Sequence, residues 1–114
     1  MPRDPRAYLW DARKAATLVD EFVAGRTWEE YESDPLLRSA VERQFEIVGE
    51  ALNQLRRVEP ELADRVPDLP RIVAFRNLLI HGYASIDGRL VWEVATERAA
   101  SLAIVLDNLL HEHP

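Results

Sequence analysis

The sequence predicts an all-α protein, an up-and-down antiparallel bundle of four main helices. Apolar residues recur at spacings of three and four in four separate segments, which is the period of an amphipathic helix. Proline or glycine stands between the segments, and no run shows the apolar–polar alternation that is typical of a strand. Four helices with short connections favour a bundle, and the length of 114 residues predicts a single domain over residues 1–114.

The first predicted helix covers about residues 5–24, and Gly25 suits its C-cap. Residues 26–34 are expected to form a connector, with Trp28 and Tyr31 lying against the bundle. The apolar positions of this helix step by three and four: Leu9, Ala12, Ala16, Val19 and Val23.

The second predicted helix opens at Pro35, which suits a first turn because its missing N–H has no intrahelical partner there. Either Ser33 or Asp34 can cap this helix. Pro60 ends it, and residues 61–66 predict a short helical turn. Its apolar stripe comprises Leu37, Val41, Phe45, Val48, Leu52 and Leu55.

The third main helix is predicted from about Pro70 to His81, where Gly82 terminates it. The last helix is predicted from Asp87 or Gly88 to His111. Its apolar positions again follow the helical period: Trp92, Ala95, Ala99, Leu102, Leu106 and Leu109.

Composition excludes several classes of protein. The chain has no cysteine, which excludes disulfides, thiolate zinc sites and a cysteine nucleophile. No apolar run approaches the roughly 20 residues that span a bilayer, and the first residues lack the apolar core of a signal peptide. We therefore expect a cytoplasmic protein with no membrane partner.

The formal net charge of −6 argues mildly against a broad surface for nucleic acid, which needs basic side chains to neutralise phosphates. Six acids lie within residues 20–34, whereas Arg76 is the only formal charge within residues 72–86. We interpret the acidic segment as a solvated face, or alternatively as a contact for a basic partner surface.

The stretch "RNLLIHGY" places four polar side chains in an apolar helix or just after it: Arg76, Asn77, His81 and Tyr83. Five residues at about 100° each put Arg76 and His81 about 140° apart around that helix. Arg76 and His81 can therefore act together in two ways. Either the helix breaks near His81 and swings the imidazole round, or two copies of the segment face each other in a dimer.

An arginine and a histidine are suited to cleave RNA without a metal. Arg76 could hold a phosphodiester and offset developing negative charge. His81 could take a proton from a ribose 2′-hydroxyl or give one to the leaving 5′-oxygen, which predicts a 2′,3′-cyclic phosphate product. Tyr83 could bond a phosphate oxygen or stack on a base.

A purely structural alternative stays open, and spacing alone favours it. His81 could cap a helix C-terminus, where a positive charge is favourable. Arg76 could pair with an acid of another helix, such as Glu46 or Glu50, and Tyr83 could be an ordinary core residue.

The sequence resembles HEPN domains of the HepT-like group. "RNLLIHGY" is similar to the R-x4-H-x-Y signature of that group, and "VERQFEIVGEALNQL" (residues 41–55) is similar to its second-helix block. "YLWDARKAATLVDEF" and "IDGRLVWEVA" are similar to its first helix and to the start of its last helix, so the resemblance covers nearly the whole chain in order. One departure is Leu69, where an aromatic residue is expected.

The resemblance implies a bundle that dimerises through the motif-bearing helices and acts as a ribonuclease at the dimer cleft, without a metal or other cofactor. It implies a toxin of a type II toxin–antitoxin system, whose partner is a small nucleotidyltransferase antitoxin of the minimal, MntA-like type. Arg76 and His81 would be catalytic, Asn77 the polar companion of Arg76, and Tyr83 the site at which the partner transfers AMP from ATP. Two alternatives are a catalytically silent HEPN binding subunit of a nucleotidyltransferase complex and a helical dimer with no role on nucleic acid.

Carboxylates and histidines outside the RNLLIHGY stretch give three further predictions. Glu50 could orient Arg76 or His81 from the adjacent helix, and Gly49 would permit the two helices to approach closely. Glu46 and Glu50 could instead form a carboxylate pair for a metal, although such pairs usually serve surface ion pairing. His111 and His113 are expected at a frayed end.

Overall fold

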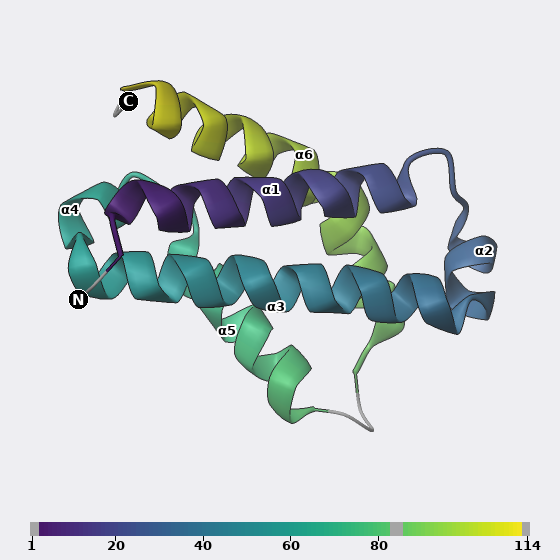
Figure 1. The fold of residues 1–114 in the computed structure, drawn as a ribbon. Helices are drawn as coiled ribbons and strands as arrows, with labels where there is room; N and C mark the ends of the chain where they lie inside the picture. Colours follow the sequence, from purple (N-terminus) through teal and green to yellow (C-terminus); the bar gives the residue numbers. More distant parts are fainter. Residues whose placement is uncertain (1–2, 83–85, 113–114) are drawn as a thin grey trace.

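The computed structural model describes residues 3–82 and 86–112, and every regular element in these ranges is an α-helix. The all-α prediction is therefore confirmed (Figure 1). In chain order the helices are α1 (Pro5–Val23), α2 (Trp28–Ser33), α3 (Pro35–Val58), α4 (Pro60–Ala63), α5 (Leu69–His81) and α6 (Gly88–Glu112).

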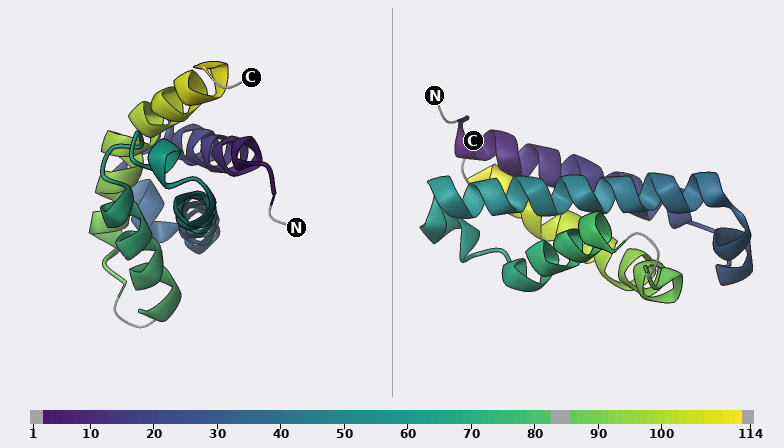
Figure 2. Two further views of the ribbon diagram at one scale, coloured as in Figure 1. Left: turned by 90° about the vertical axis from the view of Figure 1, so that its left-hand side faces the viewer. Right: turned by 90° about the horizontal axis from the view of Figure 1, so that it is seen from below.

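The two long helices α1 and α3 lie side by side and run in opposite directions, and α6 packs on α1 (Figure 1). α5 packs on α3 and stands at the edge of the bundle, away from α1 (Figures 1 and 2). α6 ends near the point where α1 begins, as an up-and-down arrangement requires (Figure 2). The helix α5, which carries Arg76 and His81, is thus the least enclosed of the long elements.

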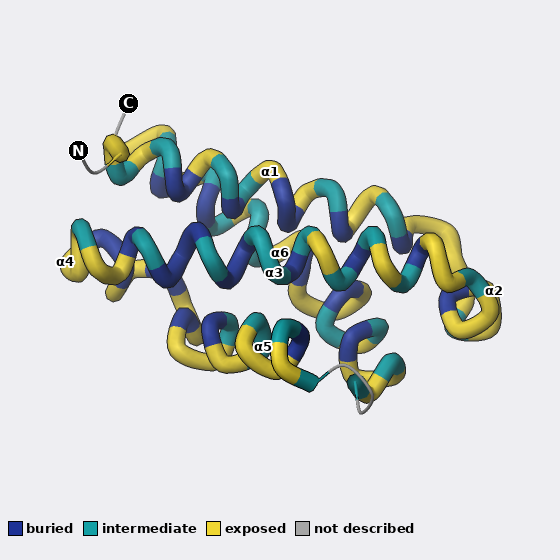
Figure 3. The backbone as a smooth tube through the Cα atoms, turned by 60° about the horizontal axis from the view of Figure 1, so that its bottom comes forward, coloured by how far each residue is buried: buried dark blue, intermediate teal, exposed yellow. Residues whose placement is uncertain are grey.

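The predicted apolar stripes form the core, and Figure 3 shows the buried faces of α1, α3 and α6 turned toward one another. All five predicted positions of α1 and all six of α3 are buried. Four predicted positions of α6 are also buried, namely Ala95, Ala99, Leu106 and Leu109, whereas Trp92 and Leu102 are half-buried. Leu69, where an aromatic residue was expected, is buried as the first residue of α5.

The predicted connector at residues 26–34 contains the helix α2, so that prediction was incomplete. Thr27 and Glu30 form a capping box: the Glu30 N–H donates to the Thr27 hydroxyl over 3.2 Å, and the Thr27 N–H donates to the Glu30 carboxylate over 3.0 Å. Tyr31 is fully buried and lies 5.2 Å, centroid to centroid, from Trp92. The expectation that Trp28 and Tyr31 lie against the bundle is confirmed, since Trp28 packs on the same core cluster.

Two helix ends depend on the residues that the sequence indicated. Asp34 caps α3, because its carboxylate accepts the Leu37 N–H over 3.1 Å, whereas the Ser33 hydroxyl donates back to the Glu29 carbonyl. α1 ends with Ala24 as its C-cap, and Gly25 follows with a φ of 74°, a left-handed conformation that glycine adopts without strain. Within the described residues, no helix has the length and apolar character that crossing a membrane requires.

Candidate functional site

The motif helix α5 is held to α3 by one apolar face. Leu69, Val73 and Leu79 of α5 are buried, and Phe75 meets Phe45 of α3 edge to face with 5.2 Å between the ring centroids. The opposite face of α5 is open, with Leu78 46% exposed. The polar motif residues therefore lie on a helix that is packed on one side only.

Arg76 crosses α3 at Gly49, where the two helices are in close contact. A Cβ atom at position 49 would lie 2.2 Å from the Arg76 Cβ and 2.6 Å from its Cγ, far inside van der Waals contact. Glycine is thus the residue that lets the aliphatic stem of Arg76 lie directly on the α3 backbone.

The Arg76 guanidinium is held between two helices. Its Nη2 donates to the Glu50 carboxylate over 2.5 Å, and its Nη1 donates to the Asn77 side-chain oxygen over 2.7 Å. Glu50 in turn accepts a hydrogen bond from the Gln54 amide over 3.1 Å. The Arg76 side chain is 23% exposed, so the guanidinium is oriented but still reaches the surface.

The Nε–H of Arg76 is buried and has no hydrogen-bond partner among the described residues. A guanidinium carries five N–H donors, one on Nε and two on each terminal nitrogen. Glu50 and Asn77 take one donor from each terminal nitrogen. Two donors, one on each terminal nitrogen, have no partner among the described residues and could bind an anionic ligand such as a phosphate.

His81 is the last residue of α5 and is exposed. Its ring makes no hydrogen bond or ion pair within residues 3–82 and 86–112. The helix stays regular up to this residue, because the Gly82 N–H donates to the Leu78 carbonyl over 2.9 Å. A helix break that swings the imidazole toward Arg76 is therefore absent, and the separation of about 140° around the helix persists.

The remaining predicted site residues divide into three cases. Asn77 is exposed and contacts the Arg76 guanidinium, and Glu50 contacts it from α3. Their roles in any reaction stay predictions. Tyr83 lies outside the described residues.

The two carboxylates of the alternative metal pair, Glu46 and Glu50, each contact an arginine, Arg43 and Arg76 respectively. Glu46 pairs with Arg43 over 3.4 Å, and the described ranges hold no group of three or more side chains that could ligate a metal ion. At the end of α6, the His111 ring bonds the Asp107 carbonyl over 2.8 Å, while His113 lies outside the described residues.

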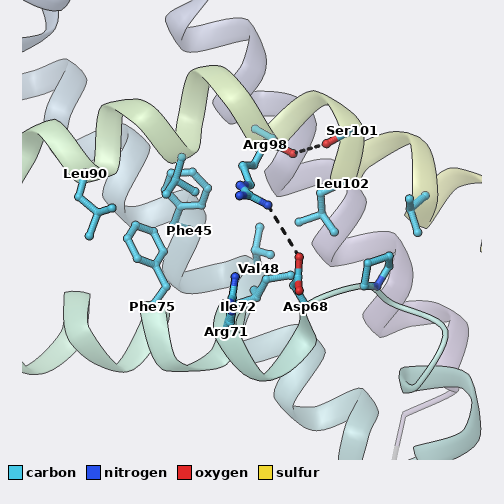
Figure 4. A pocket seen from close by; sticks show the side chains of 14 residues that line it. Phe45, Val48, Asp68, Arg71, Ile72, Phe75, Leu90, Arg98, Ser101 and Leu102 are labelled. Carbon is cyan, nitrogen blue, oxygen red and sulfur yellow. Dashed lines mark hydrogen bonds and ion pairs between the residues drawn. The ribbon is translucent and has the colours of Figure 1, made fainter.

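An apolar groove lies between α5 and α6, with α3 as its floor, and has a volume of about 530 Å³. Figure 4 shows Ile72 and Phe75 of α5 facing Leu90 and Leu102 of α6, with Phe45 and Val48 of α3 behind them. At one end, Arg98 of α6 lies 3.8 Å from the Asp68 carboxylate. The groove thus runs along the same helix that carries Arg76 and His81.

Sequence reasoning missed two features of this region. Gln54 follows Glu50 by one helical turn, and that spacing was a signal that the two side chains could bond. The groove also had a signal, because Phe75, Leu78, Leu79 and Ile80 could not all face one core.

An all-α bundle whose edge helix carries an oriented arginine and an exposed histidine agrees with the resemblance to HEPN domains. The chain belongs to the HepT-like family, since the family profile described as "Ribonuclease HepT-like" matches residues 12–109. This match confirms the resemblance seen in the sequence.

Curated relatives cover most of the chain. A Methanocaldococcus jannaschii protein named "Putative RNase" is 35% identical over 97 residues, which are 83% of this chain and 86% of the relative. A Thermococcus cleftensis protein named "Probable ribonuclease HepT" is 33% identical over 106 residues, 90% of this chain and 92% of the relative. A Caldanaerobacter subterraneus protein named "Putative RNase" is 30% identical over 110 residues, 96% of this chain and 97% of the relative. No solved structure gives a significant match.

Proposed function

We propose that this protein is a metal-independent endoribonuclease that cuts RNA through Arg76 and His81 at a cleft between two copies of the chain. Membership of the HepT-like family and the ribonuclease names of its relatives support the reaction class. The observation that carries the site is the Arg76 guanidinium: Glu50 and Asn77 orient it, and one donor on each terminal nitrogen has no partner in residues 3–82 and 86–112.

The reaction is an attack of the ribose 2′-oxygen on the adjacent phosphorus. The 2′-O–P bond forms, the P–O5′ bond breaks, and the products are a 2′,3′-cyclic phosphate and a 5′-hydroxyl. Arg76 binds the nonbridging phosphate oxygens and offsets the charge that develops on them. One His81 accepts the 2′-hydroxyl proton, and the His81 of the second copy donates a proton to the leaving 5′-oxygen.

A second copy supplies what one chain lacks. Because Arg76 and His81 face different directions on α5, one protomer cannot direct both at a single phosphate. The apolar groove beside α5, with Leu90 39% exposed at its edge, offers a surface that a second copy would cover. Docking there would bring the two motif helices together and would assemble two arginines and two histidines in one cleft.

The biological role we propose is a type II toxin whose antitoxin is an MntA-like minimal nucleotidyltransferase. In that system the Tyr83 oxygen would attack the α-phosphorus of ATP and release pyrophosphate. The resulting AMP would add bulk and negative charge beside the Arg76 cleft and would repel the phosphates of RNA. An intact mass that exceeds the sequence mass by whole AMP units after coexpression with the partner, and that Tyr83→Phe abolishes, is the expected result.

The test of the reaction uses purified protein and a labelled RNA in EDTA. We expect wild type to cut the RNA and to leave cyclic phosphate ends, and an RNA with 2′-deoxy positions to survive at those positions. Arg76→Ala and His81→Ala should each lower the rate by roughly 100-fold or more. Absence of cleavage by folded, unmodified wild type would contradict the proposal and would favour a catalytically silent binding subunit.

A further inference from the structure

We propose that Gln54 is a positioning residue for Arg76, acting through Glu50. Its kinetic consequence rests on the proposed ribonuclease function, whereas the positioning itself does not. Arg76 contacts Gly49 and Glu50 of α3, and Gln54 lies one turn beyond Glu50 on the same helix and bonds it.

The two oxygens of Glu50 have different partners. Oε1 accepts the Gln54 amide N–H over 3.1 Å, and Oε2 accepts the Arg76 Nη2–H over 2.5 Å. Rotation of the carboxylate would break both bonds, so Gln54 fixes the angle at which Glu50 meets the guanidinium. This matters because the Glu50 side chain is 47% exposed, and an exposed ion pair by itself holds its partners weakly.

The residue type at position 54 also fits the role. A glutamine amide donates a hydrogen bond without adding charge, so the negative charge of Glu50 stays available to Arg76. A lysine at this position would compete with Arg76 for the same carboxylate. A leucine would fill similar space but would leave the Glu50 carboxylate free to turn into water.

Fixing Arg76 before substrate arrives lowers the conformational cost of binding a phosphate in the productive orientation. The loss of Gln54 should therefore slow cleavage without abolishing it. We expect Gln54→Leu to reduce the cleavage rate by roughly three- to tenfold, as the loss of one hydrogen bond implies. In the Glu50→Gln background the same substitution should have little further effect, because Gln54 acts through Glu50.

Two matched variants separate positioning from general damage to α3. Gln44→Leu makes the same substitution in a half-buried glutamine of α3 that has no side-chain hydrogen bond among the described residues, and it should leave the rate unchanged. Gln54→Lys should resemble Gln54→Leu or be slower, although it keeps a donor.

A measurement that needs no catalysis tests the positioning directly. In protein labelled with 15N-arginine, we expect wild type and Gln44→Leu to show Arg76 Nη–H signals with restricted rotation about the Nε–Cζ and Cζ–Nη bonds. Gln54→Leu should lose that restriction, as should Glu50→Gln. Restricted Arg76 signals that persist unchanged in Gln54→Leu would overturn the proposal, whether or not RNA is cut. A second outcome separates the two proposals. If Gln54→Leu loses the restricted rotation of Arg76 but the wild type does not cut RNA, the positioning role is supported and only the ribonuclease function is contradicted.

Discussion

At the scale of single residues, Tyr31 carries a hydroxyl that the fold buries without a partner among the described residues. Burial raises the pKa of this hydroxyl above its ordinary value, and the nearby Glu42 carboxylate adds to the rise. A buried polar group without a hydrogen bond costs about 1–3 kcal/mol, so its removal should not destabilise the protein.

We therefore expect Tyr31→Phe to leave the free energy of unfolding unchanged or to raise it by about 1 kcal/mol in denaturant titration. Tyr8→Phe is the control, since the Tyr8 hydroxyl is not among the buried unpaired groups. A loss of more than about 1 kcal/mol in Tyr31→Phe would mean that the Tyr31 hydroxyl has a partner, such as a bound water.

Glu42 predicts a pH dependence of stability. Burial raises its pKa above the ordinary value, Arg38 opposes the shift, and Glu46 adds to it. Between the unfolded and the raised folded pKa the native state binds more protons, so stability falls as pH rises through that interval. Glu42→Gln should therefore raise the melting temperature at pH 7 and change it little at pH 4.

Glu97→Gln is the matched control for this pH dependence. Glu97 is exposed and makes no ion pair within the described ranges, so its substitution should leave the melting temperature nearly unchanged. A Glu42→Gln variant that is less stable than wild type at pH 7 would show that the attraction of Arg38 outweighs burial.

The contacts of Arg76 could be predicted from the sequence only in part. Glu50 could be named as its partner because it lies in the "GEAL" block of a neighbouring helix. The same contact fulfils the structural alternative, in which Arg76 pairs with an acid, so the ion pair by itself does not distinguish the two roles. The role of Gln54 was missed because polar pairs at i and i+4 are common on helices. The Glu50–Gln54 pair becomes informative only when the structure shows that Arg76 bonds Glu50.

At the scale of helices, the close approach of α3 and α5 depends on Gly49. In an isolated helix Gly→Ala gains about 1 kcal/mol. At position 49 the new Cβ would overlap the Arg76 stem at 2.2 Å, and we expect the forced displacement to cost about 1–3 kcal/mol beyond that gain. Gly49→Ala should thus lower stability and also lower cleavage, because Arg76 would move away from Glu50.

Gly88→Ala provides the comparison, since among the described residues its Cβ would meet only Trp28, at an ordinary 3.9 Å. This variant should keep the stability of the wild type or exceed it in thermal unfolding. Equal stabilisation by the two substitutions would show that α3 and α5 are not in close contact at Gly49.

Helix boundaries were predictable where a proline or a glycine stands at the end of a helix. Pro35, Pro60 and Gly82 fall within a residue or two of observed ends, because each changes what the backbone can do locally. α2 was taken as a connector because six residues are too few for an apolar period to repeat. The capping pair Thr27 and Glu30 was the available local signal.

At the scale of the whole molecule, the arrangement of α5 relative to α6 could not be deduced from helix patterns. Both helices have apolar faces, but the spacing of apolar residues along a helix does not predict that a groove of about 530 Å³ stays open between two helices. The angle between Arg76 and His81 could be calculated from the sequence alone, and it left two ways for them to act together: a break in the helix or a dimer. The regular end of α5 excludes the break. The dimer that remains is a prediction about a surface, and Leu90 tests it.

Leu90 is 39% exposed at the edge of the groove, and a charge there would be buried by a second copy of the chain. We expect Leu90→Glu to shift the protein from dimer to monomer in sedimentation at micromolar concentration, because burying an unpaired carboxylate costs several kcal/mol. The rate of RNA cleavage should fall with the dimer fraction. A higher concentration of the variant should partly restore both the dimer fraction and the cleavage rate. Ile104→Glu places the same charge on an exposed apolar position of α6 that does not line the groove, so it should remain dimeric and active. A dimer that survives Leu90→Glu but not Ile104→Glu would place the interface on the other side of α6, and the composite site would then need a geometry that leaves the groove open.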